Sequence, residues 1–210
     1  MDIIIAHLPN LALAYFVFFL AVASPGPATL AIAGASMSLG RPQGIAKAAG
    51  IVSGSFLWGM FAVFGMVAFI SSFAGVLYWL KILGGIYLLW MAYKAGKNAA
   101  AVDDPEQGDI GGKSLWKQYA GGFVLHTTNP KALFAWAAVI TLGLQPGAPW
   151  WMSFVVFGGA YCLSLLINFS YALFFSTDRM IKAYFKVRRW VQGVFAAIFG
   201  AAGLKLIIQG

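Results

Sequence analysis

Charge is scarce in this chain. Only 10% of its 210 residues are Asp, Glu, Lys or Arg, whereas a soluble globular protein carries about 25%. Apolar residues make up 61% of the sequence, and the mean hydropathy is +0.81. This composition excludes an ordinary soluble domain and indicates an integral membrane protein. The net charge of +8 is therefore assigned to the loops of a membrane protein, and not to a surface that binds nucleic acid.

Cysteine and histidine are nearly absent. The single cysteine, Cys162, excludes an internal disulfide, a C-x-x-C redox pair and a zinc site built from cysteines. The two histidines, His7 and His126, leave little for an imidazole metal site. We therefore expect no metal and no cofactor. A hydrolase with a Ser24–His126 dyad is disfavoured because no G-x-S-x-G turn surrounds Ser24, and we expect no enzymatic activity.

Long stretches of the sequence contain no charged residue. Residues 8–40, 48–80 and 132–177 are three such runs, and a membrane-spanning helix needs about 20 mostly apolar residues. These runs and two further apolar stretches predict an all-α integral membrane protein with six transmembrane helices. The predicted helices cover residues 11–37, 46–70, 76–93, 119–142, 152–175 and 190–208.

The positive residues lie on one side of this arrangement. Eleven of the 14 Lys and Arg residues fall in the loops after the first, third and fifth predicted helices. Positively charged loops stay in the cytoplasm, so both termini are expected to face outward, which is the periplasm in a Gram-negative cell. Segment 178–189 mixes five of these cations with apolar residues, and we expect it to lie on the anionic lipids of the cytoplasmic leaflet.

The chain divides into two similar halves. Residues 1–95 and 118–210 each hold three predicted helices, and residues 96–117 form a hydrophilic cytoplasmic linker. The segment Ser-Pro-Gly-Pro-Ala-Thr-Leu at 24–30 corresponds to Thr-Thr-Asn-Pro-Lys-Ala-Leu at 127–133, so that Pro27 aligns with Pro130. Because three helices per half force the halves into opposite orientations, the sequence predicts an inverted 3+3 repeat.

Each half has a proline in the interior of its first helix. Proline lacks an amide hydrogen and clashes with the carbonyl group four residues earlier, so we expect helices 1 and 4 to be broken. Freed backbone groups are tolerated in a membrane where they line a wet cavity, and paired breaks of this kind indicate a transporter's binding site. The candidate substrate-binding residues are therefore Ser24, Pro25, Gly26, Pro27, Asn129, Pro130 and Lys131.

Lys131 lies deep in a predicted span, and no predicted span contains Asp or Glu. An ionised lysine at the bilayer centre costs about 2.5–3.5 kcal/mol, so we expect Lys131 to hold a substrate anion such as a carboxylate, or to carry a coupled proton. His126 is a second candidate for coupling. Gly50 and Gly54 form a G-x-x-x-G pattern, which predicts close helix packing within the chain or in a homodimer. The candidate pocket-lining residues are Ser53, Trp58, Asn168 and Tyr171.

Three motifs of this chain resemble the LysE/RhtB family of amino-acid exporters: Ser-Pro-Gly-Pro at 24–27, Asn-Pro-Lys-Ala at 129–132, and Gly-Gly-Ile-Tyr-Leu-Leu-Trp at 84–90. The resemblance covers nearly the whole chain and implies an inner-membrane secondary transporter that exports amino acids or their derivatives by proton antiport. A pocket without an acid is a poor partner for a cationic side chain, so neutral substrates such as homoserine, threonine or leucine are favoured. The alternatives are a passive channel, or an exporter of another small zwitterionic or cationic metabolite.

Overall fold

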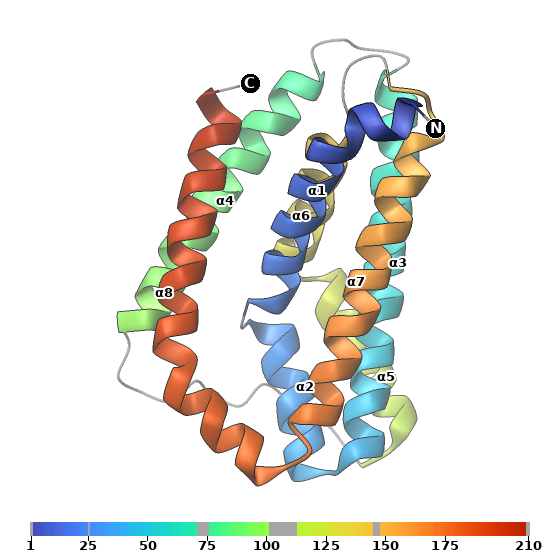
Figure 1. Cartoon of the computed structure of the whole chain (residues 1–210). Coiled ribbons are helices and arrows are strands. Elements are labelled where there is room, and N and C mark those ends of the chain that lie inside the picture. Colours follow the sequence, from blue (N-terminus) through green and yellow to red (C-terminus); the bar gives the residue numbers. More distant parts are fainter. Residues whose placement is uncertain (1, 25, 71–75, 101–112, 145–147, 209–210) are drawn as a thin grey trace.

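The computed structural model describes residues 2–24, 26–70, 76–100, 113–144 and 148–208, which form eight helices and no strand (Figure 1). The all-α prediction is therefore confirmed for these residues. The helices are α1 (Asp2–Ala23), α2 (Pro27–Ser38), α3 (Arg41–Ile70), α4 (Val76–Ala100), α5 (Leu115–Thr127), α6 (Pro130–Gly143), α7 (Met152–Phe174) and α8 (Asp178–Ile208).

The two predicted breaks are present. The first predicted helix consists of α1 and α2, whose axes meet at 50°, and the fourth consists of α5 and α6. Pro27 and Pro130 both stand at the start of the second helix of their pair. Proline is well suited to this position, because its missing amide hydrogen would have no partner there.

Two helices are long and apolar enough to cross a membrane by themselves, namely α3 over Arg41–Gly65 and α7 over its whole length. The bent pair of α1 and α2 is a third candidate span if it is counted as one. These helices identify an integral membrane protein.

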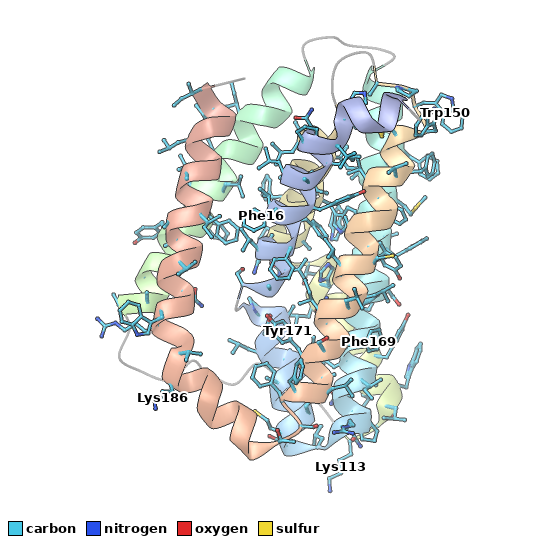
Figure 2. All side chains as sticks on the ribbon, viewed as in Figure 1. Phe16, Lys113, Trp150, Phe169, Tyr171 and Lys186 are labelled. Atoms are coloured by element: carbon cyan, nitrogen blue, oxygen red, sulfur yellow. The ribbon has the colours of Figure 1, made fainter. Side chains whose placement is uncertain are left out.

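The helices form an elongated bundle in which the chain reverses direction at each loop (Figure 1). The α1–α2 pair runs toward one end of the bundle, α3 returns, and the alternation continues through α4, the α5–α6 pair, α7 and α8. The start of α1 and the end of α8 therefore lie at the same end. Lys113 and Lys186 lie at the opposite end from Trp150 (Figure 2).

Several helix ends differ from the predicted ones. The α4 helix continues to Ala100 and α5 begins at Leu115, so part of the predicted 96–117 linker is helical, and its residues 101–112 lie outside the described residues. Segment 178–189 is the first part of α8, not a separate surface helix. In Figure 1 this part runs obliquely across the end of the bundle.

Buried apolar side chains form two clusters in the described part of the chain. The larger one joins residues of α1, α3, α4, α6, α7 and α8 around Trp136, whose ring lies 4.8 Å from that of Phe18 between centroids. The smaller one consists of Ile32, Ala48, Ile51 and Ala172, from α2, α3 and α7. The two breaks lie where the bundle passes from one cluster to the other.

The α3 and α5 helices pack with their backbones almost in contact. A Cβ atom added to Gly50 of α3 would overlap the carbonyl oxygen of Tyr119, and one added to Gly122 of α5 would overlap that of Lys47. Gly54 faces the same helix, because its added Cβ would lie 3.1 Å from Cβ of His126. The G-x-x-x-G pattern therefore packs α3 against α5 within one chain.

We expect Gly50→Ala to lower the free energy of unfolding by about 1–3 kcal/mol, because the added methyl group meets backbone that cannot rotate away. Gly65→Ala on the same helix is the matched control, since an added Cβ there meets nothing within 4 Å. That control should be neutral or slightly stabilising, because alanine favours helix over glycine. Thermal unfolding of the purified protein in detergent measures both, and equal unfolding temperatures would contradict the packing described.

Candidate functional site

The two helix breaks meet inside the bundle. Lys131, at the start of α6, donates a hydrogen bond from its Nζ to the backbone carbonyl oxygen of Ser24 over 2.9 Å, and a second to Oγ of the same residue. Ser24 is buried beside the end of α1. A Cβ atom added to Gly26 would lie 3.3 Å from the lysine Nζ, so the glycine leaves room for the lysine head group.

The carbonyl groups freed by the first break are satisfied by the second half of the chain. Pro27 has no amide hydrogen to offer the carbonyl of Ala23, four residues earlier. The hydroxyl group of Tyr171 on α7 donates a hydrogen bond of 2.7 Å to that carbonyl. Figure 2 shows Tyr171 at the level of the gap between α1 and α2. Tyr171 and Lys131 thus hold the first break in its broken form.

The second break is fixed by an N-cap. The side-chain oxygen of Asn129 accepts a hydrogen bond of 3.0 Å from the backbone amide of Lys131, which is the usual role of asparagine before a helix. The amide of Asn129 itself donates to the carbonyl of His126 over 3.2 Å. The backbone that carries the Lys131 side chain is therefore held in place at the start of α6.

A cavity of about 40 Å³ lies between the breaks. This volume admits a few water molecules, and it is far below the ~300–1,000 Å³ of pockets that hold drug-sized ligands. The cavity in this structure is therefore small. The lining residues come from α1, α2, α5, α6, α7 and the two breaks: Ala21, Val22, Gly26, Pro27, Ala28, Thr29, His126, Asn129, Lys131, Ala132, Ala135 and Asn168.

Many of the residues singled out in the sequence are gathered at this cavity. Among the predicted binding residues, Gly26, Pro27, Asn129 and Lys131 line it, as do His126 and Asn168. Ser24 and Pro130 contribute through the lysine contact and the helix start, whereas Pro25 lies outside the described residues. Ser53 and Trp58 do not line the cavity, and Ser53 instead accepts a hydrogen bond of 2.9 Å from Tyr119.

Thr29 is a lining residue that sequence reasoning missed. It is buried, and lies two positions after Pro27 in the first turn of α2. A hydroxyl group so close to a helix break is the signal that could have found it. The alanines Ala132 and Ala135 on α6 were also missed, because their contribution is the space that their small side chains leave, and no motif marks that space.

A chain of polar side chains runs from the cavity into the bundle. Asn168 donates from Nδ2 to the carbonyl of Ser164 over 2.8 Å, and the hydroxyl of Ser164 bonds to that of Ser55 over 3.2 Å. The indole of Trp136 donates to the same Ser55 hydroxyl over 3.0 Å. These bonds fix α7 and α6 relative to α3 and hold Asn168 at the cavity wall.

His126 differs from these groups. Both of its ring nitrogens are buried, and neither has a hydrogen-bond partner among the described residues. Leaving a buried donor or acceptor unsatisfied costs about 1–3 kcal/mol. His126 is also a lining residue of the cavity.

The charge in the site is positive. Lys131 lines the cavity, and none of its described lining residues is acidic. Of the six acidic residues in the sequence, only Asp2 and Asp178 fall in the described ranges, at the first positions of α1 and α8. The arrangement can bind one carboxylate through the lysine and one ammonium group through the Ser24 carbonyl, which are the two charged groups of a free amino acid.

Comparison with known proteins shows the family of this chain. The sequence profile of the family described as LysE type translocator matches residues 19–210. The chain is 26% identical over 196 residues to the threonine efflux protein of Escherichia coli (strain K12), and 25% identical over 206 residues to that of Salmonella typhi; each match covers 92% of this chain and 95% of the relative. An uncharacterized membrane protein, YahN, of Escherichia coli (strain K12) is 21% identical over 193 residues, with 92% and 86% covered. No solved structure matches the chain.

The N-cap at the second break yields a stability prediction. Asn129→Ala should lower the free energy of unfolding by about 0.5–2 kcal/mol, because the amide of Lys131 loses its acceptor. Ser114→Ala is the matched control, since Ser114 precedes α5 but its side chain caps no amide. Thermal unfolding in detergent compares the two variants. A control as destabilised as Asn129→Ala would contradict the role of the cap.

Proposed function

The chain belongs to the LysE type translocator family, and we propose that it is a secondary active transporter that exports neutral amino acids from the bacterial cytoplasm by proton antiport. The observation that carries the proposal is the meeting of Lys131 with the Ser24 carbonyl between two helix breaks. Broken helices are where transporters expose backbone groups to polar substrates.

The substrate is proposed to take over both partners of that contact. Its carboxylate binds the Lys131 ammonium group, and its own ammonium group replaces the lysine on the Ser24 carbonyl. After substrate binding, the Lys131 ammonium group and the Ser24 carbonyl each have a new partner. Neither group is therefore left unsatisfied in an apolar bundle, where an unpaired polar group is costly. Because Lys131 moves away from Ser24, the same step enlarges the cavity, which measures about 40 Å³ in this structure.

The class of substrate follows from the charges around the cavity. A lysine-like substrate would bring a second cation beside Lys131, and none of the described lining residues is a carboxylate that would stabilise it. Neutral side chains avoid this repulsion. The relatives named threonine efflux protein support the same class.

We further propose that α3, α4, α7, α8 and the pairs α1–α2 and α5–α6 all cross the membrane as an inverted repeat (Figure 1). Support comes from the alternating chain direction, and from Pro27 and Pro130 at the same position of their helix pairs. The cluster of cations at the end bearing Lys113 and Lys186 supports a cytoplasmic location for that end. Both termini would then face the periplasm.

Reporter fusions test this orientation. A reporter joined after Gly210 should behave as extracytoplasmic, and one inserted within residues 103–112 as cytoplasmic, because the cations favour the cytoplasmic side. Alkaline phosphatase and a fluorescent protein that folds only in the cytoplasm provide opposite readouts. A cytoplasmic signal from the C-terminal fusion would overturn the six-span arrangement.

Export from preloaded vesicles tests the function. Vesicles that contain the protein should release labelled threonine or homoserine against a concentration gradient when a pH gradient is imposed, with saturable rates. Labelled lysine should be released at background rates. Flux that is not saturable and ignores the pH gradient would identify a passive channel instead.

In the same vesicles, Lys131→Ala should reduce export by at least about tenfold, because the substrate carboxylate loses its cation. Lys131→Arg separates binding from coupling, since a guanidinium group binds carboxylate but stays protonated. If lysine only binds substrate, the arginine variant retains part of uphill export. If lysine carries the proton, that variant exchanges substrate but performs no uphill export. Unaltered export by the alanine variant would remove Lys131 from the site.

A further inference from the structure

The wall of the cavity contains an imidazole whose hydrogen-bonding capacity is unused. His126 stands next to the last residue of α5, lines the cavity together with Lys131 and Asn129, and has both ring nitrogens buried. No described residue bonds to either nitrogen. Buried polar side-chain atoms in folded proteins nearly always have partners, so these two atoms point to a ligand that the cavity receives.

The α3 helix packs close to the base of this side chain. A Cβ atom on Gly54 of α3 would lie 3.1 Å from Cβ of His126. His126 is thus held between α3 and the cavity that it lines.

Two other polar side chains of the wall have partners among the described residues. Asn129 uses its side-chain oxygen to cap the amide of Lys131, and Asn168 uses its side-chain nitrogen to bond Ser164. Lys131 and the Ser24 carbonyl bind the carboxylate and the ammonium group in the proposed function, and every neutral amino acid has both. These groups recognise an amino acid without distinguishing one side chain from another.

We propose that His126 determines specificity by binding a hydroxyl group in the side chain of the transported amino acid. This inference rests on the proposed function. A neutral imidazole offers one donor and one acceptor, and a hydroxyl group both donates and accepts. One hydroxyl can therefore engage the ring in either direction, whereas a methyl group can do neither. A substrate with an aliphatic side chain leaves both nitrogens unsatisfied.

Threonine and valine provide the sharpest pair of probes, because they differ only in a hydroxyl group that replaces a methyl group. The purified full-length protein is reconstituted in liposomes, and external labelled threonine exchanges for internal threonine without a pH gradient. Unlabelled threonine, valine, homoserine and norvaline compete for the exchange. Recognition is thereby measured apart from proton coupling.

For the wild-type protein, we expect valine to compete at least about tenfold more weakly than threonine, and norvaline more weakly than homoserine, since a site that bonds a hydroxyl group rejects analogues without one. His126→Leu should bring each pair close to equality, by weakening the hydroxylated member. His126→Gln, whose amide also donates and accepts, should restore part of the difference. Trp58→Phe is the matched control. It removes another buried ring nitrogen that has no hydrogen-bond partner among the described residues, and Trp58 does not line the cavity. In this variant, threonine should still compete better than valine.

Three results would overturn the inference. The first is that valine equals threonine as a competitor of the wild-type protein, in which case threonine exchange still supports the proposed function. The second is that His126→Leu and His126→Gln weaken both members of a pair equally. The third is that these variants leave the difference intact and abolish only gradient-driven transport, which would assign His126 to coupling. Absence of exchange for every amino acid would reject the proposed function itself, and this inference with it.

Discussion

A backbone carbonyl group that loses its amide partner inside an apolar bundle must find another donor, and the whole site is organised by this requirement. Pro27 removes the amide that the Ala23 carbonyl would use. The carbonyl of the next residue, Ser24, lies at the same helix end. The donors are the Tyr171 hydroxyl and the Lys131 ammonium group. Both come from the second half of the chain, so contact between the two halves satisfies the carbonyl groups at the break in α1–α2. The site is thus a joint between halves.

In the proposed function, this joint explains why a site for a zwitterion is filled by a protein side chain. Lys131 presents to Ser24 the same chemical group that an amino acid would present, so the protein's ammonium group stands in for that of the substrate. A ligand shifts a conformational equilibrium only by as much as it favours one state over the other. A carboxylate supplies that preference, because it stabilises Lys131 away from Ser24. In the proposed cycle, recognition of substrate and loosening of the joint are one event.

The parts of this protein that local chemistry determines could be predicted from the sequence. Uncharged runs located the helices, and Pro27 and Pro130 located both breaks, because proline acts on its own helix wherever it stands. Pairing between distant residues could not be predicted. Tyr171 was expected to line a pocket but bonds the Ala23 carbonyl, and no motif marked Lys47 as a buried residue of α3 beside α5. The distance between two residues along the sequence does not tell which donor will bond which carbonyl group in the folded chain.

The packing of the two halves is unequal, although their helices correspond. The larger apolar cluster includes Leu88 of α4 and Phe199 of α8, whereas the smaller cluster draws its described residues from α2, α3 and α7 alone. An inverted repeat with identical halves would pack alike on both sides of the breaks. Among the described residues, α4 and α8 contribute to the larger cluster alone, so different helices hold the two sides of the breaks together.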